Sequence, residues 1–158
     1  MNIQLTKNEQ KLVEHARKTV VKYGKSRRER GEFDNLYAFL ITENGNVYGG
    51  TAFETQPAQN SICGERHAIA NMVLGEGYSA KIESIIVADP VPSVQEHGRP
   101  PCGTDRHLIW KFGKPGTSVI LMQYIREEND WTFPKLEKFT IEELYPYAYE
   151  PSENLWDE

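Results

Sequence analysis

The sequence contains very few cysteines and no long hydrophobic run. Cys63 and Cys102 are its only cysteines, which excludes a scaffold held together by several disulfides. One disulfide between them is possible, but two cysteines in separate motifs more commonly bind metal, catalyse a reaction or lie buried. No apolar segment approaches the roughly 20 residues that a transmembrane helix requires. The first ten residues are polar and lack the apolar core of a signal peptide, so we expect a cytoplasmic protein.

The chain also lacks an excess of positive charge. It has 18 lysines and arginines against 23 acidic residues, a net charge of −5, which argues against a general electrostatic attraction to nucleic acid or to an anionic membrane. Its 39% hydrophobic and 26% charged residues are typical of a globular protein. We therefore expect a single domain over residues 1–158, with an aromatic tail at 145–158.

Hydrophobic periodicity and turn signals divide the chain into alternating helices and strands. A capping box at Thr6 and Glu9 predicts a helix over 7–24 that Gly24 can end, and the polar stretch 25–35 is interpreted as a loop. Further strands are predicted at 36–42, 47–55, 82–89, 117–124 and 130–139, and further helices from Cys63 to Gly75 or Gly77, at 102–112 and at 140–146. This order predicts an α/β fold in three layers, with helices on both faces of a mixed sheet of about five strands.

Cys63 and Cys102 each stand at the predicted start of a helix. The free N–H groups and the positive dipole there stabilise the thiolate, which is the form that binds metal. Asp105 follows Cys102 by three residues, a spacing that places both side chains on one helix face. With Cys63 supplied by a neighbouring helix, these residues can form an open tetrahedral zinc site with water in the fourth place. Glu65 is suited to take a proton from that water and pass it on.

The spacing Cys-x-Glu followed by Pro-Cys-x-x-ligand is typical of zinc-dependent nucleobase deaminases. The sequence resembles the cytidine deaminase and blasticidin-S deaminase family, whose Cys-Ala-Glu-Arg motif reads "CGER" at Cys63–Arg66 and whose Pro-Cys-Gly-x-Cys-Arg motif reads "PCGTDR" at Pro101–Arg106. Glu54 lies nine residues before Cys63, where the family has the glutamate of an Asn-Val-Glu stretch. The segment "LYPYAY", which ends at Tyr149, is similar to the family's Leu-Leu-Pro segment with its following aromatic residue.

This resemblance covers residues 5–149 and implies a three-layer cytidine deaminase-like fold, a Zn²⁺ cofactor and a nucleoside-like substrate. It also implies a homo-oligomer, in particular a tetramer, whose active sites are completed by neighbouring subunits. The implied roles are catalysis by Glu65, zinc binding by Cys63, Cys102 and Asp105, substrate binding by Glu54 and Tyr149, and hydrogen bonding to the ligand atoms by Arg66 and Arg106.

Several positions depart from the family pattern. Asp105 replaces the third ligand cysteine, and Ala52 stands where cytidine deaminases have an asparagine that helps to hold the ribose. Tyr37 and Phe39 occupy positions that the family fills with small residues. A carboxylate keeps the formal charge of the ligand set, and its oxygen is an accepted zinc ligand at about 2.0–2.2 Å. His97, in the loop before the second motif, is a weaker substitute for the third ligand.

Two functions from different classes follow from these residues. The first is a zinc-dependent hydrolytic deaminase that acts on the cytosine-like ring of cytidine, deoxycytidine or blasticidin S. The second is a non-catalytic protein of the same fold that binds a nucleoside or a protein partner, which the changes at Asp105 and Ala52 favour. The sequence leaves both hypotheses open.

Overall fold

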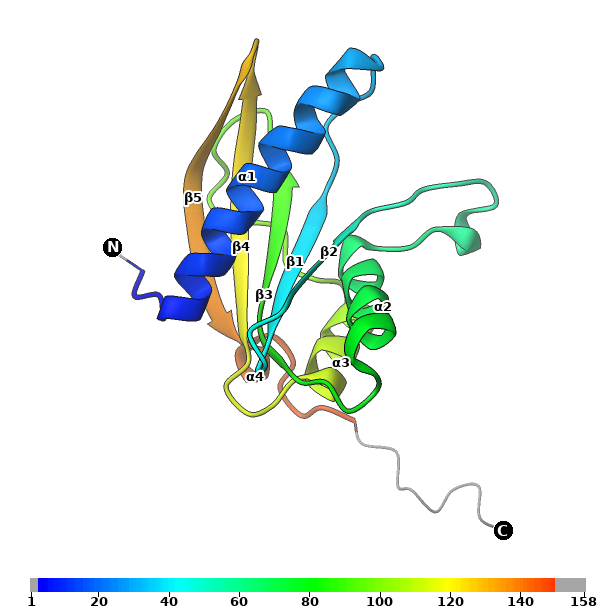
Figure 1. Cartoon of the computed structure of the whole chain (residues 1–158), viewed down its shortest axis with the longest axis vertical. Coiled ribbons are helices and arrows are strands. Elements are labelled where there is room, and N and C mark those ends of the chain that lie inside the picture. The colour runs from blue at the N-terminus through cyan, green and yellow to red at the C-terminus, as the bar shows by residue number, and fades with distance from the viewer. Residues whose placement is uncertain (1–2, 150–158) are drawn as a thin grey trace.

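The computed structural model describes residues 3–149, which form one five-stranded mixed sheet between two layers of helices (Figure 1). The strands lie in the order β2-β1-β3-β4-β5, and only β3 and β4 are parallel. This confirms the predicted fold class and element order. The strands are β1 (Tyr37–Thr42), β2 (Val47–Thr51), β3 (Ile82–Pro90), β4 (Ser118–Glu127) and β5 (Asp130–Thr140). The helices are α1 (Lys7–Glu29), a 3₁₀ turn η1 (Ala58–Asn60), α2 (Gly64–Glu76), α3 (Gly103–Phe112) and α4 (Ile141–Leu144).

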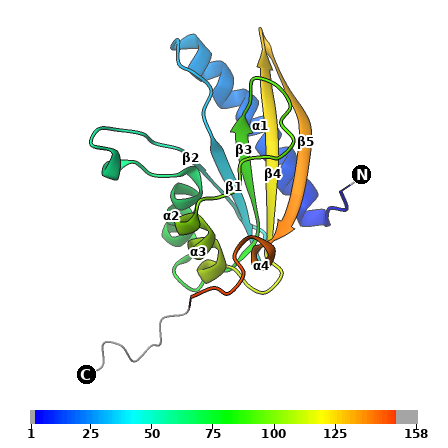
Figure 2. The same ribbon diagram turned by 180° about the vertical axis from the view of Figure 1, so that it is seen from behind.

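The two faces of the sheet carry separate hydrophobic cores. Phe39 and Ile41 of β1 belong to the core under α1, whereas Ala38 and Leu40 belong to the core under α2 and α3. This alternation follows from the two-residue period of a strand. Because both faces are covered, all six residues of β1 are buried, and the central strands read as continuous apolar runs. Figure 2 shows α2 and α3 together on the face opposite α1.

Helix α1 extends to Glu29, so the predicted end at Gly24 and the predicted loop from residue 25 are wrong. Gly24 is buried in the helix because the indole of Trp131 packs against it, and a Cβ at this position would lie 2.6 Å from that ring. Glycine here permits close packing and does not end the helix. The polar residues that follow have good helix propensity and continue the helix for another turn.

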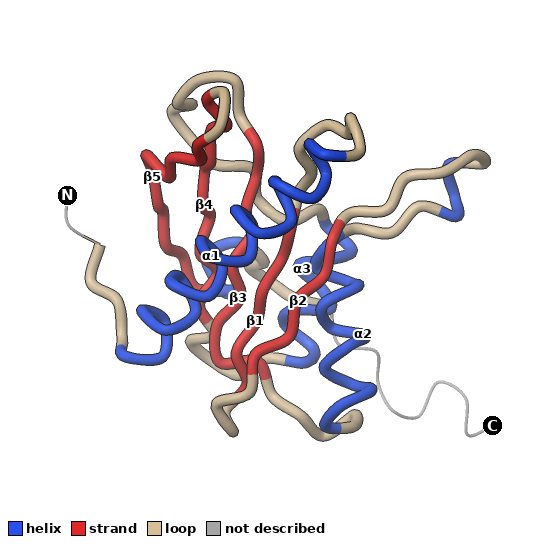
Figure 3. Tube along the Cα trace, turned by 45° about the horizontal axis from the view of Figure 1, so that its top comes forward, coloured by secondary structure: helices blue, strands red, loops and turns tan. Residues whose placement is uncertain are grey.

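Two further boundaries differ from the prediction. Strand β2 ends at Thr51, and residues 52–62 form an arm that leaves the sheet and carries η1 at its tip (Figure 3). An isolated bridge between Phe53 and Ile62 joins the two sides of this arm. Pro100 and Pro101 precede the N-cap Cys102, so they lie outside α3 and not in its first turn. Within residues 3–149, no helix is both long and apolar enough to cross a membrane.

The aromatic tail is only partly buried in the single chain. Tyr145 packs edge-to-face against Trp110, and its hydroxyl oxygen lies 3.2 Å from His107 Nδ1, within hydrogen-bond distance. Tyr147 and Tyr149 are exposed. Trp156, which we also expected to pack, lies outside the described residues. Among the tail aromatics that the structure describes, only Tyr145 therefore packs on the core of its own chain.

A buried carboxylate joins α1 to strands β4 and β5. Glu9 accepts hydrogen bonds from Ser118 Oγ at 2.6 Å and from Lys138 Nζ at 2.8 Å, and it also accepts from the backbone N–H of Thr6 in the predicted capping box. Burial alone would raise the pKa of Glu9, but these hydrogen bonds outweigh it and hold the pKa below its ordinary value. The charged form of Glu9 therefore stabilises the folded chain.

We expect Glu9→Gln to lower the free energy of unfolding by about 1–3 kcal/mol at pH 7, because the amide cannot accept at both positions. A pKa that is lower in the folded state gives stability above the unfolded value, which is lost as the pH falls. The difference between wild type and variant should therefore shrink below about pH 4.5. Urea unfolding at pH 7 and pH 4 measures this difference in the free energy of unfolding. The exposed Glu14→Gln on the same helix is the control, and an equal effect in both variants would contradict the role of Glu9.

Candidate active site

The N-termini of α2 and α3 meet at the same end of the sheet. Cys63 and Cys102 are the N-cap residues of these two helices, and neither side chain makes a capping hydrogen bond. The structure brings their sulfur atoms and a carboxylate oxygen of Asp105 within 4.8 Å of one another. The Cys102 thiol donates to Asp105 Oδ2 at 2.9 Å. Three side chains that are distant in the sequence thus form one cluster.

Close contact between α2 and β2 holds Cys63 in this place. A Cβ at Gly50 of β2 would lie 2.4 Å from the backbone nitrogen of Ala68 and 2.5 Å from the carbonyl oxygen of Gly64. Real Cβ atoms do not approach backbone atoms so closely, so a side chain at Gly50 would push the helix away. The position of the first turn of α2 therefore depends on glycine in the neighbouring strand.

Asp105 is fully buried, and the environment of its carboxylate is incomplete. Arg66 Nε lies 3.4 Å from Asp105 Oδ1, but neither atom has a hydrogen-bond partner among the described residues. Arg66 Nη2 also contacts Cys63 Sγ at 3.6 Å. A buried carboxylate oxygen without a hydrogen bond is costly, and a cation between the three side chains would satisfy it. Two sulfurs and one oxygen in this arrangement fit the donor set and the open geometry of a zinc site.

Cys63 holds its thiol proton tightly. Burial raises the pKa of Cys63 to about 11, and the nearby carboxylate of Asp105 adds to this effect against the hydrogen bond from Arg66. Because a thiolate is the form that ligates a metal, binding at this cluster must release a proton. Metal affinity should therefore increase with pH.

Glu65 lies in the first turn of α2 and lines the same cavity as the cluster. Its side chain is buried, with 3% of the residue exposed. Burial raises the pKa of Glu65 to about 7, and the negative charge of Asp105 acts in the same direction. A carboxyl group with a pKa near 7 can both accept and donate a proton at neutral pH, as a general acid–base catalyst must.

The cavity in front of the cluster has a volume of about 520 Å³, which suits a small organic molecule. Glu54 and Ala52 line it from the base of the arm. Tyr149 does not line it and is 63% exposed. Arg106 donates to the carbonyl oxygens of Pro101 and Leu144, at 2.7 and 2.9 Å, so its hydrogen bonds are not to ligand atoms.

His97, the weaker substitute ligand, also lies elsewhere. Its Nδ1 is 3.1 Å from Glu137 Oε1, and it is not part of the cluster with the two cysteines. Asp105 is therefore the only one of the two candidates for the third ligand that the structure places beside Cys63 and Cys102.

Sequence reasoning missed several polar residues of the cavity. Asp89 lies near the carboxyl end of β3, and Arg99 Nε is 3.6 Å from its Oδ1. Burial raises the pKa of Asp89, while Arg99 opposes the change. Asp34 and Asn35 enter from the segment before β1. The sequence did contain a signal for Asp89, because this residue ends a buried apolar run and ligands bind outside the carboxyl ends of parallel strands. Arg99 and Asp34 belong to loops whose course the sequence does not indicate.

A three-layer α/β fold with a zinc-type ligand cluster at the N-termini of two helices defines the class of this protein as deaminase-like. No family model matches the chain. A segment of 101 residues, 64% of the chain, is 27% identical to a cytidine deaminase of Mycoplasma pneumoniae, of which it covers 73%. The chain is therefore a cytidine deaminase homologue.

Solved structures agree with this assignment at the level of the fold. The cytidine deaminase of Burkholderia pseudomallei superposes with a TM-score of 0.60 at 22% identity, over 83% of this chain and 97% of that one. The cytidine deaminase of Mycobacterium tuberculosis superposes with a TM-score of 0.52 at 17% identity, over 74% and 80% of the two chains. The three-layer architecture is therefore that of the cytidine deaminases.

The ligand role of Asp105 can be tested by zinc titration. We expect Asp105→Asn to weaken zinc binding at least tenfold, because a neutral amide replaces the charged oxygen, whereas Asp105→Cys should retain tight binding. Competition with a chromogenic chelator measures the affinity, and the absorption of the Co²⁺-substituted protein reports the number of thiolates. Asp89→Asn changes a cavity carboxylate outside the cluster and is the control. Unchanged affinity in Asp105→Asn would exclude Asp105 as a ligand.

Proposed function

We propose that the protein is a zinc-dependent hydrolytic deaminase that acts on the cytosine-like ring of a nucleoside or nucleoside analogue. The observation that carries this proposal is the position of Glu65. A buried carboxyl group with a pKa of about 7 lies beside a cluster of two cysteines and one aspartate, and both face one cavity. The sequence similarity to a cytidine deaminase supports the same reaction class.

Cys63, Cys102 and Asp105 would hold the metal, and zinc supplies Lewis-acid chemistry that makes a water acidic near neutral pH. Glu65 would take one proton from the attacking water while the oxygen of that water bonds to the amino-bearing carbon of the ring. The same carboxyl group would pass this proton to the adjacent ring nitrogen, then take the second proton of the former water from the new hydroxyl group and give it to the departing amino group. The two protons of the water end on these two nitrogens, the water oxygen becomes the new carbonyl oxygen, and ammonia leaves.

Burial of Glu65 serves each of these steps. Because the pKa of Glu65 is about 7, the carboxyl group can accept a proton at neutral pH and can also release it readily. Arg66 lies between Cys63 and Asp105, and its positive charge balances the carboxylate. We assign Arg66 a positioning role, since its contacts are with the proposed ligands. Arg106 has a more distant role, because it fixes the carbonyl of Pro101 immediately before Cys102.

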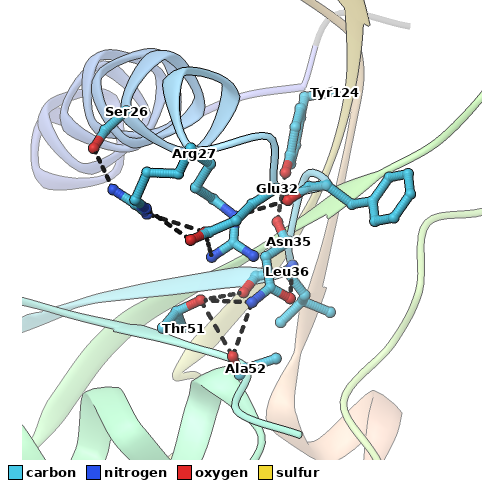
Figure 4. A network of polar contacts seen from close by, with 10 residues as sticks. Ser26, Arg27, Glu32, Asn35, Leu36, Thr51, Ala52 and Tyr124 are labelled. Carbon is cyan, nitrogen blue, oxygen red and sulfur yellow. Dashed lines mark hydrogen bonds and ion pairs between the residues drawn. The ribbon is translucent and has the colours of Figure 1, made fainter.

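Substrate selection depends on the wall formed by Asn35 and Ala52. Glu54 offers a carboxylate that can accept a hydrogen bond from a sugar hydroxyl, but Ala52 has no side-chain amide with which to assist it. The amide of Asn35 is nearby but already donates to Thr51 Oγ1 at 3.1 Å and to the Ala52 carbonyl at 2.9 Å (Figure 4). We infer a substrate whose sugar or sugar-like part is held differently from the ribose of cytidine.

Tyr149 would bind substrate in a neighbouring subunit of a homotetramer. It is exposed and lies outside the cavity of its own chain. An exposed aromatic residue is suited to cover the substrate ring of another subunit. The tetramer and this role of Tyr149 both remain predictions from the sequence resemblance.

Besides the changes at Asp105 and Ala52, one contact supports the non-catalytic alternative. The Cys102 thiol donates to Asp105 Oδ2, so one oxygen of this carboxylate has a partner within the protein. A nucleoside-binding protein of this fold could retain such an arrangement. It would bind nucleosides in the cavity but would neither need zinc nor release ammonia.

The experiment is an ammonia-release assay of the zinc-loaded protein with cytidine, deoxycytidine and blasticidin S. We expect Glu65→Gln to lower kcat by about 10²–10⁴-fold, because the amide cannot transfer protons, while zinc binding is retained. Glu54→Gln is the matched control and should mainly raise KM. Turnover that survives in Glu65→Gln would refute the assigned role. A zinc-loaded protein that binds but does not turn over any of these compounds would favour the non-catalytic alternative.

A further inference from the structure

A second cavity of about 560 Å³ lies on the opposite side of the β1–β2 pair, beside the second half of α1. Helix α1 crosses the sheet diagonally and leaves this part of the sheet uncovered (Figure 1). The cavity shares no lining residue with the candidate active site. We call it the α1–β2 cleft; its walls come from α1, β1, β2 and α2.

The floor of the α1–β2 cleft is aromatic. Tyr23 of α1 stacks on Tyr37 of β1 with 6.2 Å between ring centroids, and Tyr37 stacks on Phe39 at 6.3 Å. Gly49 of β2 lies opposite Phe39, and because a Cβ there would come within 3.1 Å of the Phe39 ring, glycine allows that ring to lie against the strand. Tyr23 is 47% exposed, so part of its ring is accessible to a ligand. A row of near-parallel rings with one open end favours a flat ring as the occupant.

The rim of the cleft is cationic. Lys22 and Arg27 of α1 and the C-cap residue Arg30 line it, and no carboxylate does. One carboxylate, that of Glu32, is shared by two of these cations, at 3.5 Å from Arg27 and 2.7 Å from Arg30. Lys22 has no ion pair within residues 3–149, and its ammonium nitrogen lies 5.7 Å from the centre of the Tyr23 ring. The rim is therefore positive in a chain whose net charge is negative. Guanidinium and ammonium groups at such a site favour a phosphate.

One polar group of the floor lacks a partner. Tyr37 is 5% exposed, and its hydroxyl oxygen makes no hydrogen bond to any described residue. A buried hydroxyl in this state costs about 1–3 kcal/mol. Tyr37 lines the cleft together with Arg27 and Arg30, and the carboxylates of Asp34 and Glu32 also act on its hydroxyl. A ligand with an acceptor oxygen near these arginines would supply the missing hydrogen bond.

We propose that the α1–β2 cleft binds a nucleoside monophosphate, with the base against the Tyr23–Tyr37 stack and the phosphate against Lys22, Arg27 and Arg30. The volume of the cleft suits one ligand of this size. This site is separate from the candidate active site and does not depend on deaminase activity.

Adenosine 5′-monophosphate is a suitable probe, because it has the ring and the phosphate but no cytosine that would direct it to the candidate active site. We expect it to bind at least tenfold more tightly than adenosine or inorganic phosphate in calorimetric titrations of the full chain. Lys22→Glu and Tyr23→Ala should each weaken binding at least fivefold. Both residues are exposed on α1, so the fold should tolerate the changes, which circular dichroism checks. Lys25→Glu alters an exposed lysine of the same helix outside the cleft and is the matched control.

Amide chemical-shift mapping locates the ligand. Shifts at Tyr23, Tyr37 and Gly49 that saturate with the probe, together with an unaffected Lys25→Glu, would support the site. No binding at millimolar concentration, shifts confined to Cys63 and Glu65, or an equal loss in Lys25→Glu would overturn it. Cleft signals that change with protein concentration in the absence of the probe would also overturn it, because a second copy of the chain would then cover this surface.

Discussion

The contact between α2 and strand β2 is the constraint on which both cavities depend. Because Gly50 has no side chain, the backbone of α2 lies directly on the sheet edge, and this fixes the direction of its first turn. One side of that turn presents Cys63 and Glu65 to the candidate active site. His67, in the same helix, reaches around the edge of the sheet and lines the α1–β2 cleft. A single packing contact thus determines the geometry of two sites on opposite sides of a strand pair.

The candidate active site departs from local stability rules at several residues that are close together. Ser, Thr, Asp and Asn are the usual N-caps, yet two helices here begin with cysteines that make no capping bond. Asp105 is buried with an unpartnered oxygen, and Glu65 is buried with a raised pKa. Such departures concentrate at functional sites, where chemistry and not folding selects the residue. The two helices whose ends lie outside this region, α1 and α4, have complete capping boxes.

The sequence was sufficient to predict the fold class, the order of the elements and the capping boxes, because each depends on local periodicity or on neighbouring residues. The sequence was misleading at Gly24. Glycine is needed there because the indole of Trp131, more than 100 residues away in the sequence, packs against the helix at this point. The approach of Asp105 to Cys63 could be predicted only through motif spacing. The course of the arm over residues 52–62 and the entry of Arg99 into the cavity are set by long-range packing, which one sequence does not reveal.

The outer edge of β2 is closed by side chains of α2 and not by another strand. Asn71 Nδ2 donates to the Gly49 carbonyl at 2.8 Å, and the Thr51 N–H donates to His67 Nδ1 at 3.2 Å. Unpaired edges of this kind are where sheets of different molecules join, so these two side chains occupy backbone groups that could pair with a strand of another molecule. The helix that carries the proposed catalytic glutamate therefore also covers this edge of the sheet. A change that moves α2 away from β2 would uncover these backbone groups.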